Sequence, residues 1–194
     1  IVPVIKKHDL LVISDEIYAE LTYGGKHVSI ASLPGMKERT VVINGFSKAF
    51  AMTGWRVGFV CSPPEIDAAV LKIHQYTLLC ASTASQYAAL EALKDGFADA
   101  FASVEAMREE YDKRRRFMTG FFNGAGMPCF EPRGAFYIYP STEKLGVTGE
   151  DFANGLLRAE KVAVVPGDAF GSAGKYHVRC SYATGMDELR EAVA

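Results

Sequence analysis

The sequence predicts an α/β fold, in which part of a large α/β/α layered domain is followed by a small α+β domain. In the first half, short apolar runs alternate with helical patterns, and this alternation is typical of layered α/β domains. In the second half, one long amphipathic helical pattern precedes shorter strand and helix patterns. Because the pattern changes near Phe97, we expect one domain over residues 1–96 and a second over residues 97–194.

Three apolar runs in the first half predict strands, over residues 10–13, 40–44 and 57–61. Runs without polar alternation are typical of strands that are buried on both faces of a sheet. Helical patterns precede and follow these strands. Their bounds are read from proline, which is tolerated in the first turn of a helix, and from glycine, which commonly ends one. They cover residues 2–8, a segment opened by Pro63 and Pro64, and a segment from about Thr83 to Gly96.

The long helical pattern of the second half covers residues 104–121. Two later pairs, Thr148 with Asp151 and Thr184 with Asp187, resemble capping boxes, in which a Ser or Thr side chain caps the first turn of a helix. We therefore expect a helix to begin after each threonine. Strand patterns lie between these helices, over residues 135–139, 162–165 and 177–183.

Composition and charge exclude several classes of protein. With 49% hydrophobic and 23% charged residues among 194, the chain is not expected to be disordered, collagen-like or a coiled coil. Its formal net charge of −2 offers no attraction for nucleic acid or for an anionic membrane. No apolar run approaches the roughly 20 residues that a membrane helix needs. We therefore expect neither a nucleic acid nor a membrane as a partner.

The four cysteines lie far apart in the sequence and form no C-x-x-C pair. This spacing is typical of reduced thiols in a cytoplasmic protein rather than of a zinc site or a disulfide framework. The histidines show no metal-ligand spacing either, so no metal is expected. The chain begins at Ile1 within a helical pattern, and on that ground we expect further chain upstream.

Asp15 directly follows the first predicted strand, and Tyr18 lies three residues later. In open α/β sheets, ligands bind outside the carboxyl ends of the strands. One interpretation is that Asp15 caps a short helix from Glu16 while Tyr18 packs on the core. The other is that a nearly buried carboxylate at this position needs a cation, which a ligand would supply. Taken alone, Asp15 favours the helix cap.

Lys48 follows the second predicted strand and has apolar neighbours, among them Phe46 and Phe50. Most lysines are solvated surface groups. A lysine held among apolar side chains, however, has a lowered pKa and can act as a Schiff-base nucleophile. Arg56 enters the third strand behind Trp55, either as a surface arginine stacked on that ring or as a guanidinium fork for a phosphate. No glycine-rich phosphate loop competes for the second role.

Arg179 lies within the last predicted strand. Alternation puts Val178, Cys180 and Tyr182 on one face of that strand and Arg179 on the other. An arginine within a strand of a mostly apolar unit suits a bidentate contact with a carboxylate. A surface charge on an edge strand explains the same pattern equally well.

The order and spacing of these residues resemble a known family. The stretches VISDEIYAELTY, VVINGFSKAFAMTGWRVGF, SQYAALEAL, PRGAFYIYP, VAVVPGDAFG and YHVRCSYA together are similar to the class I and II pyridoxal-phosphate-dependent aminotransferases, which are fold type I enzymes. The stretches cover nearly all of the chain and match the C-terminal half of such an enzyme. The resemblance therefore implies that the first predicted domain is the second half of the cofactor-binding domain.

The resemblance assigns three residues to the reacting end of pyridoxal 5′-phosphate. Lys48 would bind the cofactor covalently as a Schiff base and then move the substrate's proton. Asp15 would pair with the protonated pyridine nitrogen and keep the ring able to accept electrons. Tyr18 would donate to the ring's 3′-oxygen. On this reading Lys48, Asp15 and Tyr18 are catalytic residues.

The resemblance also implies the residues that bind the two anionic groups. Arg56 would bind the cofactor phosphate, and the Ser47 hydroxyl would add to the phosphate or backbone network. Arg179 would bind the substrate's α-carboxylate. The chain departs from the family at Gly45, where many members have a hydroxyl residue that contacts the phosphate. That departure affects only the set of phosphate contacts.

The implied activity is transfer of an amino group between an L-amino acid, aspartate-like or aromatic, and a 2-oxo acid such as 2-oxoglutarate. The full-length protein would be a cytoplasmic homodimer, and the 194-residue chain alone is expected to be inactive. One alternative is another pyridoxal-phosphate reaction on the same scaffold, such as a β-elimination or a synthase step. A second alternative is a non-catalytic module. The presence of both Lys48 and Asp15 disfavours the second alternative.

Overall fold

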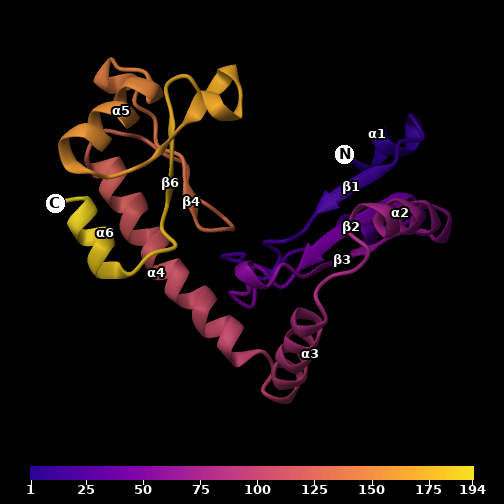
Figure 1. Ribbon diagram of the computed structural model, residues 1–194. Coiled ribbons are helices and arrows are strands. Elements are labelled where there is room, and N and C mark those ends of the chain that lie inside the picture. The colour runs from indigo at the N-terminus through magenta and orange to yellow at the C-terminus, as the bar shows by residue number, and fades with distance from the viewer. The chain divides into compact units, whose positions relative to one another are not determined.

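The computed structural model describes residues 1–194 as a mixed α/β chain with two compact units, Ile1–Glu105 and Ala106–Ala194 (Figure 1). The division falls inside the long helix α4 (Ala102–Gly124). A functional domain boundary near Phe97 stays a prediction from the sequence.

The first unit is built on a three-stranded sheet in the order β1 (Val12–Asp15), β2 (Thr40–Gly45), β3 (Gly58–Cys61) (Figure 1). β1 and β2 are parallel, and Asp15 lies opposite Ile43. β3 runs antiparallel to β2, so that Gly58 lies opposite Gly45. The carboxyl ends of β1 and β2 and the beginning of β3 therefore lie at one edge of the sheet.

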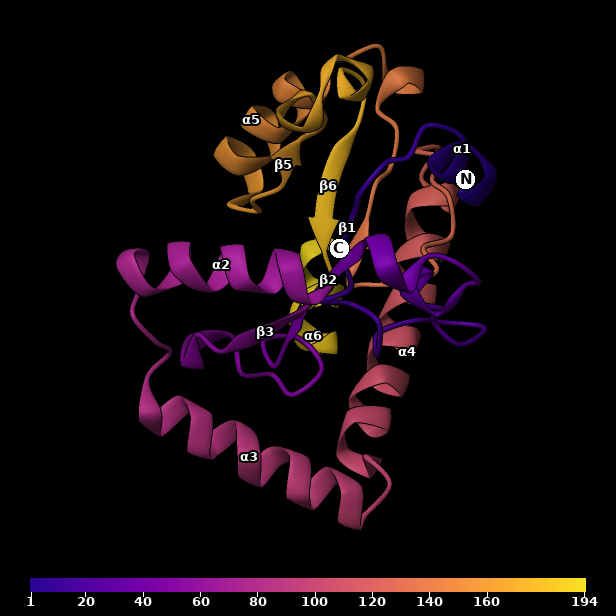
Figure 2. The ribbon, with the colours of Figure 1, turned by 90° about the vertical axis from the view of Figure 1, so that its right-hand side faces the viewer.

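Three α-helices belong to this unit: α1 (Val2–Lys7), α2 (Pro64–Thr77) and α3 (Thr83–Ala98), and Figure 2 shows α2 and α3 from the side. α3 contributes Ala89 to a core cluster with Phe46 and Met52. The predicted stop at Gly96 is wrong, because α3 continues to Ala98. Gly96 instead gives room to the Phe101 ring, which lies directly over it. None of the helices combines the length and the hydrophobicity needed to cross a bilayer.

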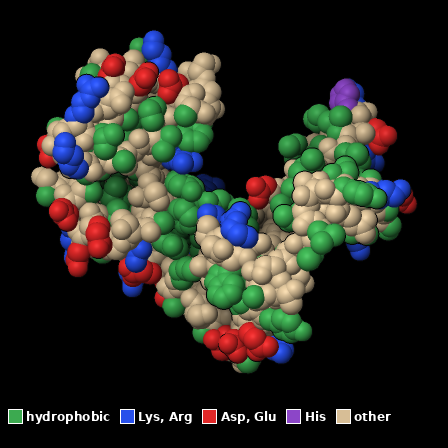
Figure 3. Space-filling model, viewed as in Figure 1, with side chains coloured by type: hydrophobic (Ala, Val, Ile, Leu, Met, Phe, Trp, Pro, Cys, Tyr) green, Lys and Arg blue, Asp and Glu red, His purple; other side chains and the backbone are tan.

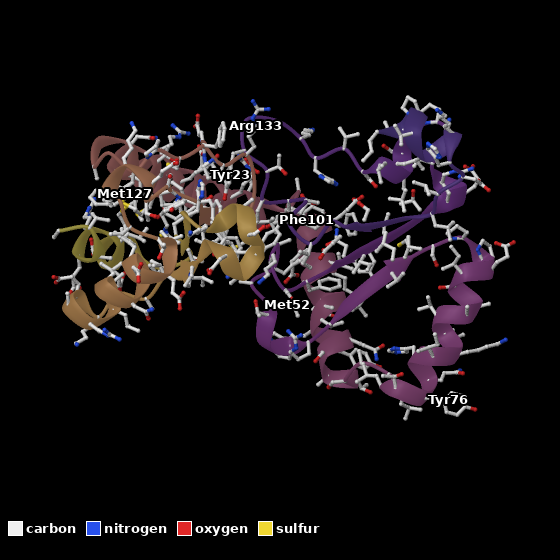
Figure 4. The ribbon with its side chains drawn as sticks, turned by 90° about the horizontal axis from the view of Figure 1, so that it is seen from above. Tyr23, Met52, Tyr76, Phe101, Met127 and Arg133 are labelled. Atoms are coloured by element: carbon white, nitrogen blue, oxygen red, sulfur yellow. The ribbon has the colours of Figure 1, made fainter.

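The strand predicted over residues 10–13 is not buried on both faces. Leu11 is 68% exposed and Ile13 74%. The physical reason is that one face of β1 is left uncovered, since exposure alternates along the strand with Ile13 exposed and Val12 half-buried. Tyr76 near the end of α2 also extends away from the ribbon (Figure 4). Hydrophobic side chains are accordingly visible on the surface of this unit (Figure 3).

The second unit packs helices against a small antiparallel sheet. Its strands follow the order β4 (Tyr137–Ile138), β6 (Val178–Ser181), β5 (Val165–Pro166). The helices α5 (Gly149–Glu160) and α6 (Met186–Ala192) share one core with the C-terminal part of α4. The core cluster comprises Met118, Phe122, Met127, Ile138, Ala153, Val178, Cys180, Tyr182 and Leu189. The predicted alternation along β6 is confirmed, because Val178, Cys180 and Tyr182 are all buried.

One of the two predicted helix caps is confirmed and the other is wrong. The Thr148 hydroxyl accepts a hydrogen bond of 3.1 Å from the Asp151 backbone N–H at the start of α5. Helix α6 instead begins from Gly185 and has no side-chain cap. The carbonyl of Thr184 accepts a 2.5 Å hydrogen bond from the Arg114 guanidinium, and Asp187 pairs with a residue on α6 itself.

Glycines allow a close backbone approach around the end of β5. Gly174 lies against the carbonyl of Gly167 and the hydroxyl of Tyr139, and a Cβ on Gly174 would overlap both. The Tyr139 hydroxyl donates a 3.0 Å hydrogen bond to the Gly167 carbonyl. A side chain at position 174 would therefore displace backbone as well as a tyrosine.

We predict that Gly174→Ala lowers the free energy of unfolding by about 1–3 kcal/mol, because overpacking forces the neighbouring backbone to shift. Gly155→Ala is the matched control, since Gly155 lies inside α5 with open space around its Cα. Alanine there should raise the free energy of unfolding by about 0.5–1 kcal/mol. Urea denaturation of both variants checks the pair. Equal stability of the two would show that the approach at Gly174 is not tight.

A buried carboxylate fixes the chain after β1. Glu16 is 6% exposed and accepts hydrogen bonds from the Ser29 hydroxyl at 2.7 Å and the Ser14 hydroxyl at 3.1 Å. Nε2 of His27 lies 3.0 Å from its second oxygen. Burial alone would raise the pKa of Glu16, but these partners outweigh burial and hold the pKa below its ordinary value.

This lowered pKa predicts an acid dependence of stability. The stabilisation by Glu16 is present above the ordinary pKa near 4.5 and is lost as the pH falls through the lowered value in the folded protein. Glu16→Gln should therefore lower the free energy of unfolding by about 1–3 kcal/mol at neutral pH. The difference from wild type should shrink on acidification. Melting temperatures measured against pH check this, with exposed Glu38→Gln as control; a difference that does not vary with pH would contradict it.

Candidate functional site

Lys48 lies in a turn that begins where β2 ends. Phe46 and Met52, on either side of it, are buried in the cluster against α3 and anchor the turn. The apolar neighbours seen in the sequence thus fix the backbone of the turn. Lys48 itself is half-buried, and its Nζ lies 5.7 Å from the centroid of the Tyr18 ring. The turn therefore directs Lys48 toward the segment that follows β1.

Asp15 is the last residue of β1, at the same edge of the sheet. No helix begins at Glu16, so the helix-cap interpretation is wrong. Asp15 instead closes a turn, in which its Oδ1 accepts a 3.2 Å hydrogen bond from the Ile17 N–H. The Glu16 N–H donates to the Ile43 carbonyl at 2.8 Å and ties this turn to β2.

The Asp15 carboxylate is exposed, which differs from the nearly buried group expected from the sequence. Asp15 shares the uncovered face of β1 with Ile13, and this explains the exposure. Burial therefore does not force a partner on Asp15. What points to a ligand is the position of Asp15, since it shares the carboxyl edge of the sheet with the Lys48 turn.

Arg56 has an unusual backbone conformation. It ends the short helix η3 (Thr53–Trp55) with φ 52° and ψ 49°, in the left-handed region that favours glycine. Its Nη1 donates a 2.8 Å hydrogen bond to the Thr53 carbonyl, and the Thr53 hydroxyl donates a 2.9 Å bond to the Ser47 carbonyl. Arg56 is thereby linked to the Lys48 turn. Strained residues of this kind concentrate at functional sites.

Gly45 and Gly58 approach each other closely across β2 and β3. A Cβ at position 45 would lie 2.8 Å from the Cα of Gly58 and 3.0 Å from the carbonyl oxygen of Val57. A hydroxyl residue at position 45 would therefore require β3 to move. This contact explains the departure from the family at Gly45 and leaves the half-buried Ser47 as the nearest hydroxyl in the turn.

Arg179 belongs to the second unit, whereas Asp15, Tyr18, Ser47, Lys48 and Arg56 all belong to the first. The strand that carries it, β6, is the central strand of its sheet, so the edge-strand interpretation of Arg179 is wrong. Arg179 is half-buried, and its Cζ lies 4.5 Å from the ring centroids of both Tyr137 and Phe170.

Three supporting residues were not identified from the sequence: Thr53, Tyr137 and Phe170. The position of Thr53 between Lys48 and Arg56 gave a weak signal. No pattern linked Phe170 to Arg179, because the contact depends on how the chain folds after β5.

The donor set at the edge of the first sheet fits pyridoxal 5′-phosphate. An amine, a carboxylate and a phenol are placed by Lys48, Asp15 and Tyr18, and an arginine with a hydroxyl residue follows at Arg56 and Ser47. The amine matches the aldehyde of the cofactor, and the carboxylate matches its pyridine nitrogen. The phenol matches its phenolic oxygen, and the arginine with the hydroxyl residue matches its phosphate.

The comparisons with known proteins all match this chain to aminotransferases. The family model described as aminotransferase class I and II matches residues 1–194. An aspartate aminotransferase from Pyrococcus abyssi is 50% identical over 188 residues, which are 96% of this chain and 48% of that protein. The aromatic-amino-acid aminotransferase 2 of Thermococcus litoralis is 45% identical, with the same two coverages.

A solved structure agrees with these sequence matches. The aromatic aminotransferase from Pyrococcus horikoshii superposes with a TM-score of 0.94 at 48% identity, over 98% of this chain and 51% of that one. The chain thus spans about half the length of the relatives that it matches. It shares their fold, and it belongs to the class I and II aminotransferases.

Proposed function

We propose that this chain is the C-terminal half of a pyridoxal-phosphate-dependent aminotransferase that transfers an amino group between an L-amino acid and a 2-oxo acid. One observation carries the proposal furthest. Lys48 Nζ lies 5.7 Å from the Tyr18 ring, at the sheet edge where Asp15 ends β1. Amine, phenol and carboxylate are the groups that the cofactor's chemistry needs at that place.

When bound, pyridoxal phosphate supplies a ring that takes up the electrons of the substrate's Cα–H bond. The Lys48 amine would take the proton from the substrate's Cα, hold it, and deliver it to C4′ of the cofactor. The Asp15 carboxylate keeps a proton on the pyridine nitrogen by favouring its charged form. The Tyr18 hydroxyl donates to the 3′-oxygen.

Arg56 binds the phosphate with a guanidinium edge, and the Ser47 hydroxyl adds a donor. Arg179 binds the α-carboxylate that amino acids and 2-oxo acids share, because a guanidinium fork matches a carboxylate. Aspartate-like or aromatic substrates are supported by the names of the relatives, and 2-oxoglutarate is the proposed acceptor. Residues 1–96 would belong to the cofactor-binding domain and residues 97–194 to the small domain.

The proposed whole protein is a homodimer in the cytoplasm. The half-length coverage of the relatives supports a longer polypeptide, and the exposed apolar side chains of the first unit support further packing partners. The four cysteines are unpaired, which supports a reducing compartment.

We predict that Lys48→Ala in the full-length enzyme lowers turnover by about 100–10,000-fold, since the general acid–base group is lost. Lys72→Ala, which removes an exposed lysine of α2, is the control and should match wild type. Turnover with an L-amino acid and 2-oxoglutarate, together with circular dichroism spectra, checks this. Full activity in folded Lys48→Ala would overturn the assignment.

Arg56→Gly separates the backbone role of this position from its side-chain role. Glycine tolerates the left-handed conformation, so the free energy of unfolding should rise by up to about 1 kcal/mol. The affinity for pyridoxal phosphate should fall by about 10–100-fold, because a charged hydrogen-bond donor is lost.

Ala51→Gly is the matched control for Arg56→Gly. Ala51 has φ 51°, so that glycine relieves a similar strain without removing a guanidinium. This variant should keep its affinity for the cofactor. Absorbance titration with pyridoxal phosphate and urea denaturation measure both quantities. Unchanged cofactor affinity in Arg56→Gly would show that Arg56 does not bind the phosphate.

A further inference from the structure

The surroundings of Arg179 differ from those of the arginines on α4. Arg115 is almost fully buried and is paired with Asp112 and Glu131. Arg114 pairs with a neighbouring carboxylate, Glu110. Arg179, in contrast, contacts two aromatic rings and has no carboxylate or carbonyl partner in its unit. Its N–H donors are therefore available to an external anion.

The two rings reach Arg179 from different elements. Tyr137 belongs to β4, which pairs with β6, and Phe170 ends the short helix η5 (Gly167–Phe170) after β5. Both ring centroids lie 4.5 Å from the guanidinium carbon. At this distance a cation is attracted by the π-electrons of a ring, and the contact does not use up an N–H donor as a carboxylate would.

Both rings pack against further aromatic side chains. Phe170 packs edge-on against Tyr139, with centroids 6.5 Å apart. Tyr139 in turn stacks on His177 at 4.8 Å and is tied to the Gly167 carbonyl through its hydroxyl. Tyr137 packs against the neighbouring Phe136 ring at 4.8 Å. Because Tyr137 and Phe170 are themselves held by packing, they limit the rotamers open to the half-buried Arg179 side chain.

We propose that Tyr137 and Phe170 are positioning residues. Their rings hold the Arg179 guanidinium so that the N–H edge of the guanidinium meets the substrate's carboxylate. The proposal rests on the proposed function, in which Arg179 binds that carboxylate. The rings act on binding of both substrates, since amino and 2-oxo acid share the group. They take no part in proton transfer at Lys48.

The expected effect is a change in KM rather than in kcat. Loss of one ring should raise KM for both the amino acid and the 2-oxo acid by about 3–30-fold, the range that cation–π contacts support. The variants are Phe170→Leu and Tyr137→Leu in the full-length holoenzyme. Tyr137→Phe keeps the ring and should retain most of the wild-type affinity. Phe130→Leu, at a 97% exposed ring of the same unit, is the control.

A double-mutant cycle distinguishes positioning from a general structural effect. In an Arg179→Lys background, which lacks the planar fork, Phe170→Leu should add little to KM, because the ring acts through the guanidinium. An equal KM increase in both backgrounds would overturn the proposal. A loss of kcat at unchanged KM, or a Tyr137→Phe variant as impaired as Tyr137→Leu, would also overturn it.

The failure of this inference and the failure of the proposed function give different results. If the wild-type holoenzyme shows no amino transfer, the proposed function is wrong. If wild type is active and Arg179→Lys raises KM for both substrates, but both leucine variants equal wild type, only the positioning by Tyr137 and Phe170 is wrong.

Discussion

The parallel pairing of β1 with β2 is the constraint on which the candidate cofactor site depends. This register places Asp15 opposite Ile43, so that the turn after β1 and the turn with Lys48 leave the sheet at the same edge. The Glu16 N–H continues the pairing by bonding to the Ile43 carbonyl. A slip by one residue would move Asp15 to the other face of the sheet. The segments that carry the functional groups are thus placed by backbone hydrogen bonds.

The second constraint is the tight path from β2 to β3. Gly45 and Gly58 allow the two strands to approach at the edge, and Phe46 anchors the intervening turn in the core. The chain then passes through Arg56 in a left-handed conformation, with Thr53 bridging back to Ser47. This path is strained at one residue and closely packed at another, which is expected where a fixed geometry is needed for binding.

Much of this arrangement was predictable from the sequence, because apolar runs and strand alternation reflect local periodicity. The strands around Asp15 and Lys48, the cap at Thr148 and the buried face of β6 followed from such patterns. The exposure of Asp15 did not, since a run of apolar residues does not reveal that one face of β1 is left uncovered.

Contacts between segments that lie far apart in the sequence could not be predicted from local patterns either. The carbonyl of Thr184 is bound by Arg114, which lies 70 residues away in the sequence, and this contact accompanies a helix start at Gly185. Phe170 reaches Arg179 only through the fold of the chain after β5. The resemblance to aminotransferases supplied the roles of single residues, and the structure supplied their supports.

The most direct test of the account is the identity of the lysine that binds the cofactor. The full-length holoenzyme is reduced with borohydride, digested and mapped by mass spectrometry. We expect one pyridoxyl group, on the peptide that contains Lys48, because this lysine lies beside Tyr18 at the carboxyl edge of β1 and β2. A pyridoxyl group on another lysine, with Lys48 unmodified, would contradict it.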